Sequence, residues 1–220
     1  NFAVFSNGTK VKSIAQKVGD KDFGTVKVEL SKGKSFQVVI IAHSGASSAT
    51  ITSPEKISFD GKVTDTFYAY QEITVHEPKD YSVELKRAVA MFRLVVEDDA
   101  PDQIKKLQFK YTGGSSTFNA VTGHGCVNSK QTEERTVSQQ GKTFEIYTFP
   151  HEDTDVLKIT VNAMDPADNI LFTRTFEDVD VKRNMITQYS GMFYGEIVNP
   201  EANSFKFLVD SHWEEKDMRY

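Results

Sequence analysis

The stretch YSVELKRAVAMFRLVVE, residues 81–97, changes the parity of its apolar positions at the basic pair Lys86-Arg87. Before the pair the apolar positions are odd-numbered; after it the even-numbered set is unbroken, namely Ala88, Ala90, Phe92, Leu94 and Val96. In a strand, a one-residue change of parity turns the buried side chains to the opposite face of the sheet. The stretch is also longer than the usual strand of about 5–6 residues. We therefore predict two strands that meet at Lys86-Arg87, with a domain junction at that point.

The composition allows one large β domain or two small ones, because the 220 residues are 39% hydrophobic and 11% aromatic. The net charge of -5, the pI near 5.6 and the absence of a basic stripe argue against a nucleic-acid-binding protein. The sequence contains no run of 18 apolar residues and no charged, apolar leader, so we expect neither a membrane span nor a signal peptide. Cys126 is the single cysteine, which excludes an internal disulfide.

Apolar residues alternate along almost the whole chain. Residues 26–30 alternate, and the apolar run 36–42 after Lys32-Gly33 is typical of a central strand, so we predict a hairpin of these two. The turn chemistry of 165–169 predicts another hairpin. Further strands are predicted at 63–70, 107–111, 143–149, 156–163, 170–176 and 185–194. Residues 11–18 have helical spacing over about two turns, which leaves a helix and an irregular strand equally open.

Short strands without βαβ alternation predict an all-β protein of two tandem antiparallel β-sandwich domains. The first domain is expected at residues 1–86, and the second at 87–220 with a C-terminal tail strand. The side chains expected in the first core are Phe36, Val38, Ile40 and Leu85, and those in the second are Phe92, Leu94, Phe109, Ile159 and Phe172.

Residues that could carry chemistry do not form a recognisable set. His124 and Cys126 could face the same way on a strand, but zinc needs about four ligands and no second pair exists. No Gly-x-Ser-x-Gly elbow supports a catalytic serine. Paired carboxylates such as Asp153 and Asp155 are interpreted as solvated loop ends. We therefore expect no catalytic residue, no metal and no cofactor.

Two short motifs have alternative interpretations. Asn7-Gly8-Thr9 matches a glycosylation acceptor, but Asn-Gly is favoured as a hairpin turn. Tyr68 and Tyr70 alternate with Phe67 and Ala69, so the two tyrosines share one face. If exposed, they could stack on sugar rings together with Trp213, although the wet face of a strand is the more usual place for tyrosine.

Several segments in order resemble the fimbrillin-type subunits of the Bacteroidia, over about residues 2 to 195. The C-terminal segments are LKRAVA (85–90), DVDVKRNMIT (178–187) and YSGMF (189–193). The N-terminal segments are similar to the anchor and minor-subunit branch of that family: DFGTV (22–26), VIIAH (39–43), ISF (57–59) and TDTFY (64–68).

This resemblance implies two transthyretin-like β-sandwich domains on an exported lipoprotein of a fimbrium at the outer membrane and cell surface. It implies no enzymatic activity and no cofactor, and its partners are other fimbrial subunits. The family's lipid-bearing cysteine would lie before Asn1. Polymerising members act by strand complementation after an arginine- or lysine-specific protease removes a leading strand, which makes Arg87 a possible protease site.

A sandwich that lacks an edge strand leaves unpaired backbone groups that a partner's strand can satisfy. We expect the acceptor edge beside Phe2, Val4 and Phe5. Phe205, Phe207 and Val209 form a candidate donor strand, or else the last strand of the chain's own second domain. The function expected is that of a non-enzymatic fimbrial anchor or accessory subunit. A surface glycan-binding module is the alternative, a hydrolase is a distant third, and the position in the fibre stays open.

Overall fold

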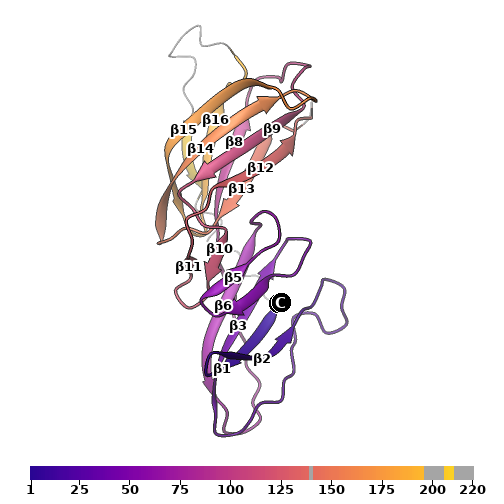
Figure 1. Ribbon diagram of the computed structural model, residues 1–220, viewed down its shortest axis with the longest axis vertical. Coiled ribbons are helices and arrows are strands. Elements are labelled where there is room, and N and C mark those ends of the chain that lie inside the picture. The colour runs from indigo at the N-terminus through magenta and orange to yellow at the C-terminus, as the bar shows by residue number, and fades with distance from the viewer. Residues whose placement is uncertain (139–140, 196–205, 211–220) are drawn as a thin grey trace.

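The computed structural model describes residues 1–138 and 141–195 in full and the backbone of 206–210 (Figure 1). These residues form strands β1 to β17 and no helix. The strands assemble into four sheets, and the chain is therefore all-β, as predicted.

Two sheets form the N-terminal part of the molecule, which lies in the lower half of Figure 1. Sheet I has the order β2-β1-β3-β6-β7 and contains β1 (Phe2–Ser6), β2 (Thr9–Ile14), β3 (Ser35–His43), β6 (Thr66–Thr74) and β7 (Lys86–Arg87). Sheet II has the order β11-β10-β5-β4 and contains β4 (Thr50–Ser53), β5 (Lys56–Ser58), β10 (Thr117–Asn119) and β11 (His124–Gly125).

The other two sheets form the C-terminal part. Sheet III has the order β12-β9-β14-β15 and contains β9 (Lys106–Thr112), β12 (Gln131–Thr136), β14 (Thr154–Met164) and β15 (Ile170–Lys182). Sheet IV has the order β13-β8-β16-β17 and contains β8 (Ala90–Val96), β13 (Thr143–Thr148), β16 (Ile186–Gly191) and β17 (Lys206–Asp210). All described pairings are antiparallel except that of β16 with β8.

Each part has its own buried cluster. The C-terminal cluster includes Leu94 and Phe144 of sheet IV with Phe109 and Val161 of sheet III, so these two sheets pack face to face. Phe92 lies in it with 1% of its surface exposed. The N-terminal cluster lies between sheets I and II. It contains, among others, Ala3, Phe5, Val39, Ile41, Ile51, Ile57 and Phe118.

Most strands were predicted correctly. The predicted strands at 36–42, 107–111, 143–149, 156–163 and 185–194 coincide with β3, β9, β13, β14 and β16 to within a few residues. The strand predicted at 170–176 begins where β15 begins, but β15 continues to Lys182. The hairpin around Asp165–Asn169 is confirmed by the pairing of β14 with β15 and by the hydrogen bond from the Asp165 amide to the Asn169 carbonyl. Asn7 and Gly8 both have positive φ and join β1 to β2, as predicted for a turn.

Two expectations about the N-terminal part are wrong. Residues 26–30 form no strand, and β3 pairs with β1 and β6. The alternative left open for residues 11–18 is decided in favour of a strand, since residues 9–14 form β2. The face of β3 that points into the N-terminal cluster carries the odd-numbered residues, and not the even-numbered ones as expected. Val39 and Ile41 are fully buried in the cluster, whereas Val38, Ile40 and Leu85 are only half-buried.

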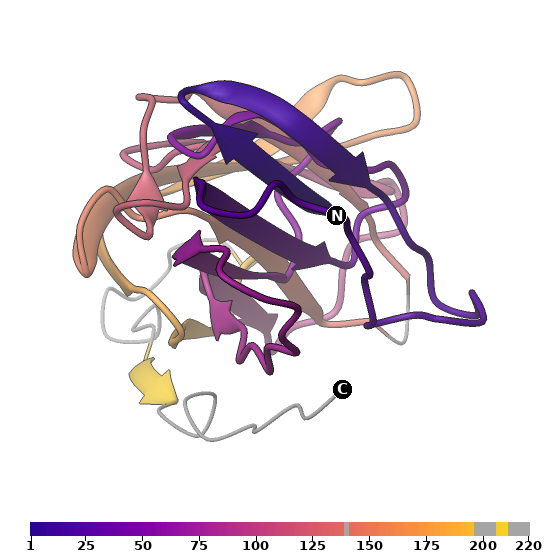
Figure 2. The same ribbon diagram turned by 90° about the horizontal axis from the view of Figure 1, so that it is seen from below.

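Of the two strands predicted to meet at Lys86-Arg87, only the second is found, as β8. Residues 81–85 form no strand, and the basic pair itself forms the two-residue β7, which belongs to a different sheet from β8. The chain nevertheless crosses the boundary between the two parts a second time. Residues 113–127, here called the inserted hairpin, leave the end of β9 and pair through β10 with β5 of the N-terminal part before the chain returns to β12. Seen from below, the N-terminal strands lie in front of the C-terminal ones (Figure 2). The division into domains 1–86 and 87–220 stays a prediction that this hairpin complicates.

Candidate subunit interface

The expected acceptor edge beside Phe2 to Phe5 is wrong, because β1 is an internal strand. It pairs with β2 on one side and with β3 on the other. Val4 and Phe5 are fully buried, and Phe2 is half-buried. In the described part of the chain, the outer strands of sheet I are β2 and β7.

Sheet I has apolar side chains on both of its faces. The face that points away from the N-terminal cluster is here called the outer face. The strand register places Phe2 beside Ile40 and Val4 beside Val38, on the side of the sheet that points away from the cluster. Phe36, on the same side, is only 5% exposed, although no described sheet packs there. Segments outside the sheets must therefore cover this face.

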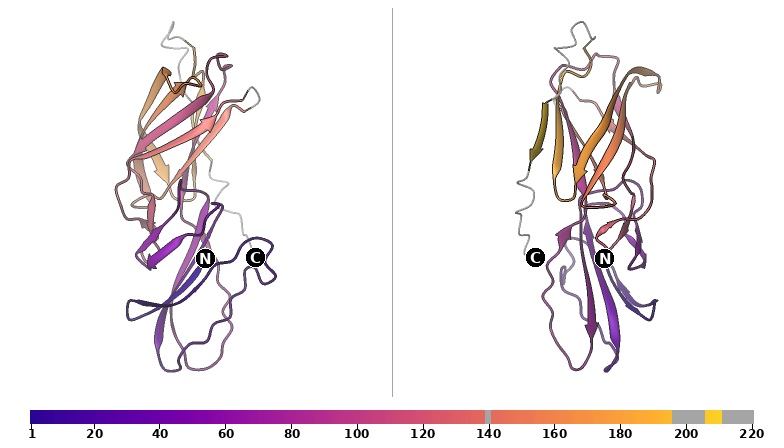
Figure 3. Two further views of the ribbon diagram at one scale, coloured as in Figure 1. Left: turned by 45° about the vertical axis from the view of Figure 1, so that its right-hand side comes forward. Right: turned by 90° about the vertical axis from the view of Figure 1, so that its left-hand side faces the viewer.

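Two irregular segments supply the cover, residues 15–34 and 75–85, which run along this side of sheet I (Figure 3). Val26, Val28 and Leu30 are half-buried, while the residues between them are exposed. The Gly33 amide donates to the Val75 carbonyl at 2.7 Å and the Val75 amide to the Lys34 carbonyl at 3.1 Å, so the two segments are joined where they leave the β3–β6 pair. Residues 26–30 therefore alternate because every second side chain is partly buried, and not because they pair with a neighbouring strand.

The tail strand β17 pairs with β16 of sheet IV, with Phe207 opposite Tyr189 and Val209 opposite Thr187. In this arrangement it is the last strand of the chain's own C-terminal part. Phe205 and Trp213 lie outside the described residues. A donor role for the tail stays a prediction.

Tyr68 and Tyr70 share the face of Val39 and Ile41, so they point toward the N-terminal cluster rather than into solvent. The ring of Tyr68 meets that of Phe118 edge-on, with centroids 4.8 Å apart. The Tyr70 hydroxyl donates to Glu72 at 2.6 Å, and burial is the main cause that raises its pKa. These two tyrosines form no exposed stacking platform.

Arg87, the predicted protease site, is enclosed at the junction of the two parts. Its side chain is 7% exposed and binds both carboxylate oxygens of Asp65, through Nε at 2.8 Å and Nη2 at 3.2 Å. Its Nη1 donates to Asn184 of the C-terminal part, and its guanidinium lies 4.5 Å from the centroid of the Phe67 ring. A protease that must extend this segment would first have to break these contacts.

A second arginine joins the same two parts. Arg183 Nη1 donates to the Tyr68 hydroxyl at 3.2 Å and to the Gly123 carbonyl, while Nη2 donates to Asp153 at 2.8 Å. His124 lies 3.3 Å from the same Asp153 oxygen. Among the described residues, no group of three or more His, Cys, Asp or Glu side chains could hold a metal ion.

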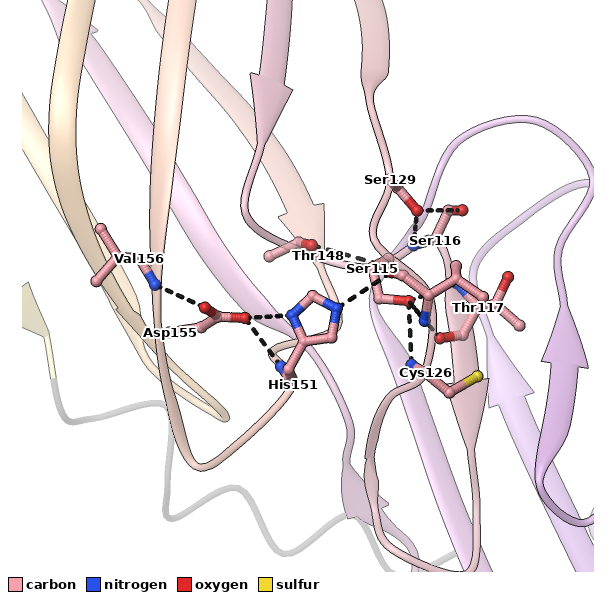
Figure 4. Close-up of polar contacts among 10 residues, drawn as sticks. Ser115, Ser116, Thr117, Cys126, Ser129, Thr148, His151, Asp155 and Val156 are labelled. Carbon is pink, nitrogen blue, oxygen red and sulfur yellow. Dashed lines mark hydrogen bonds and ion pairs between the residues drawn. The ribbon is translucent and has the colours of Figure 1, made fainter.

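The inserted hairpin is the feature that sequence analysis missed. At its base Ser115 is fully buried and accepts hydrogen bonds from the amides of Thr117, Cys126 and Val127 while donating to the Thr117 carbonyl at 2.6 Å (Figure 4). A Cβ on Gly113 would lie 2.0 Å from the Val156 carbonyl oxygen, so only glycine fits there. The Gly-Gly-Ser-Ser run 113–116 was the available signal, because glycine in a strand marks a close backbone approach.

Residues 47–217 match the family of unknown function DUF6562. The chain belongs to this family. No curated protein matches this DUF6562 member. None of its described residues forms a helix long and apolar enough to cross a membrane.

Several solved structures are similar to this DUF6562 chain at low identity. A candidate adhesin from Bacteroides ovatus has a TM-score of 0.49 and 12% identity, over 66% of this chain and 65% of its own. A candidate adhesin from Bacteroides thetaiotaomicron has a TM-score of 0.48 and 12% identity, over 96% and 87%. A fimbrial assembly protein from Parabacteroides distasonis has a TM-score of 0.44 and 12% identity, over 94% and 89%. At this level of similarity these likenesses assign no function to the chain.

Proposed function

We propose that the chain is a non-enzymatic structural subunit of a bacterial surface fimbrium, in an anchor or accessory position, that binds neighbouring subunits by β-strand complementation. In this proposal the two parts are tandem transthyretin-like sandwiches. The chain is exported and held at the outer membrane by a lipid. The sequence resemblance to fimbrillin-type subunits supports the family, the partners and the location.

The structural observation that carries the proposal is the outer face of sheet I. It is apolar, it includes the fully buried Val4, and irregular segments cover it in place of a paired strand. A strand from a partner could pair with an outer strand of sheet I in the plane of the sheet, and its apolar side chains on the outer side could displace part of the cover made by residues 26–30. Such addition combines main-chain hydrogen bonds with pockets for alternate side chains.

The test uses peptides that copy the terminal strands of subunits encoded beside this chain. A peptide that binds only the folded chain stabilises it by about 2.7 kcal/mol at 100 times its Kd, which raises the melting temperature. A control peptide in which the inward apolar residues are replaced by Asp should leave the melting temperature unchanged. Hydrogen exchange at residues 26–30 should increase when the active peptide binds, because the cover is displaced.

A matched pair of variants locates the acceptor. Val28→Asp places a charge on the half-buried side of the cover, so it should loosen the cover and increase peptide affinity. Lys27→Asp changes the exposed neighbour and should leave the affinity unchanged. Equal affinities of the two variants would place the acceptor elsewhere.

The glycan-binding alternative rests on Tyr68, Tyr70 and Trp213. The first two point toward the cluster, and the third is not among the described residues. If no subunit peptide changes the melting temperature while a glycan does, the fimbrial proposal fails and the glycan-binding module replaces it.

A further inference from the structure

His151 lies at the base of the inserted hairpin, where the hairpin ends. Its Nδ1 is 2.7 Å from Asp155 Oδ2, and its Nε2 is 3.1 Å from the carbonyl oxygen of Val127 (Figure 4). One imidazole therefore joins the end of the hairpin to β14.

These partners determine the protonation state that the site favours. A carboxylate oxygen and a carbonyl oxygen can only accept, so both ring nitrogens must donate to satisfy them. Neutral imidazole carries one N–H, and only the imidazolium carries two. Asp155 is itself held by the amides of His151 and Val156, both at 2.9 Å, so it cannot turn away without losing these bonds.

The same arm of the hairpin has a second contact with this region. His124 of β11 lies beside Asp153, which also binds Arg183. Asp153 and Asp155 belong to the same connection, from β13 into β14. The amide of Gly125 donates to the Pro150 carbonyl of this connection at 2.7 Å. The hairpin that completes sheet II is thus fastened to the C-terminal part along one short segment.

We propose that His151 is a pH-sensitive latch that, as an imidazolium, fastens the inserted hairpin to the β13–β14 connection and, on losing its proton, lets the base of the hairpin open. Because β10 and Phe118 of this hairpin complete sheet II and its cluster, the latch controls how firmly the two parts of the molecule are joined. This inference does not depend on the proposed fimbrial function.

The charges around the ring favour the closed state. Burial lowers the pKa of His151, but the hydrogen bonds to Asp155, Val127 and Gly113 and the charge of Asp155 outweigh it, and the pKa is raised. Glu152 and Asp180 line the same hollow as His151. On the hairpin itself, burial raises the pKa of the Cys126 thiol, which keeps this neighbour uncharged.

The direction of the pH dependence follows from this. A raised pKa in the folded state gives stability that is complete below the unfolded pKa of about 6.5 and is lost as the pH rises through the folded pKa. The latch is therefore closed in mild acid and opens above the pKa of His151.

The first test is a titration of the intact chain followed by imidazole nitrogen NMR. The reference is the free histidine side chain, with a pKa of about 6.5. At pH 6 both nitrogens of His151 should carry protons, and its midpoint should lie above that of the free side chain. A singly protonated His151 at pH 6, or a midpoint at or below that of the free side chain, would overturn the proposal without any variant.

The second test measures hydrogen-exchange protection factors of the Cys126 and Val127 amides from pH 5 to pH 9. For each unit by which the His151 midpoint exceeds that of the free side chain, hairpin opening should increase by about tenfold across the titration. Amides in the middle of β9 should show no such change. His151→Gln should abolish the pH dependence, while His76→Gln and His124→Gln should keep it.

Asp155→Asn provides a second route in case His151→Gln does not fold, because it should lower the His151 midpoint toward that of the free side chain. Two results would contradict the proposal. One is a pH dependence of the protection factors that is lost in His124→Gln instead of His151→Gln. The other is protection factors that are the same at pH 5 and pH 9.

Discussion

The C-terminal part buries its cluster between two sheets of its own, whereas the N-terminal part is completed by pieces that come from elsewhere. Sheets III and IV consist of strands from residue 90 onward, and their facing side chains fill the space between them. Sheet II needs β10 and β11 from the inserted hairpin, and the outer face of sheet I is covered by irregular segments. One part is therefore self-sufficient, and the other depends on chain that follows it.

This difference indicates where the molecule can change and where it cannot. Sheet-to-sheet packing lets neither partner move without opening the cluster. A cover without ladder hydrogen bonds opens at lower free energy, since few buried contacts and paired amides hold it. A partner is thus expected to act on the N-terminal part, and the C-terminal part serves as the rigid support.

The largest expected effect comes from dividing the chain. A fragment of residues 1–89 lacks Phe118, Ala120 and Phe149 of its cluster as well as two of the four strands of sheet II. It should show no cooperative thermal transition by circular dichroism. The fragment 90–220 retains the whole C-terminal cluster and should unfold cooperatively. A cooperative transition of fragment 1–89 would show that the two parts are independent after all.

Much of the C-terminal part could be predicted from the sequence. The even-numbered residues from Ala90 to Val96 mark β8 because they all lie in the C-terminal cluster, whereas Ala88 precedes the strand and lies in the N-terminal cluster. The Asp165–Asn169 turn is local, since the Asp165 carboxylate accepts from the amides of Ala167 and Asn169. A turn that is determined by its own residues can be predicted from the sequence alone.

The N-terminal part was predicted less well for two physical reasons. Alternation reports which side chains are buried, and Val26 to Leu30 alternate because they cover a sheet face without pairing to a neighbouring strand. In β3 both faces are apolar, so the periodicity does not show whether the face with Val39 or the face with Phe36 points into the cluster. The pairing of β10 with β5 joins residues far apart in the sequence, and no periodic pattern specifies such a partner.

Two phenylalanines compare the packing of the two parts directly. Phe92 is 1% exposed between sheets III and IV, and Phe36 is 5% exposed under the irregular cover. Phe92→Ala should lower the free energy of unfolding by about 3–5 kcal/mol, because the sheets cannot close on the cavity. Phe36→Ala should cost less, since the cover can collapse onto the gap. Equal losses in denaturant unfolding would mean that the cover is as firmly packed as a sheet.

Proteolysis tests the junction between the parts. Native trypsin should cleave the exposed segment at Lys21 well before Arg87, because the Arg87 side chain is 7% exposed and bound to Asp65. Asp65→Asn removes the ion pair and should cost about 1–3 kcal/mol, since a partly buried charge loses its partner. It should also speed cleavage after Arg87, as followed by mass spectrometry of the fragments. Rapid cleavage of the unaltered chain at Arg87 would contradict the enclosed geometry and favour a processed, polymerising subunit.

The smallest expected effect lies in the hairpin turn at the edge of sheet I. Gly8 has φ +75° with no atom within 4 Å of a built Cβ, so the cost of Gly8→Ala is conformational and not steric crowding by neighbours. A left-handed conformation costs an L-residue about 1–2 kcal/mol, and the free energy of unfolding should fall by roughly that amount. Asn7→Gly is the matched control, because Asn7 also has positive φ and glycine adopts it readily, so its stability should stay within a few tenths of a kcal/mol. Because β2 pairs only with β1 within sheet I, the loss should be confined to this edge, with raised hydrogen exchange in β2 and none in β8. Increased hydrogen exchange in both β2 and β8 would instead show that this edge is coupled to the C-terminal part. The C-terminal part would then not be independent of the N-terminal part.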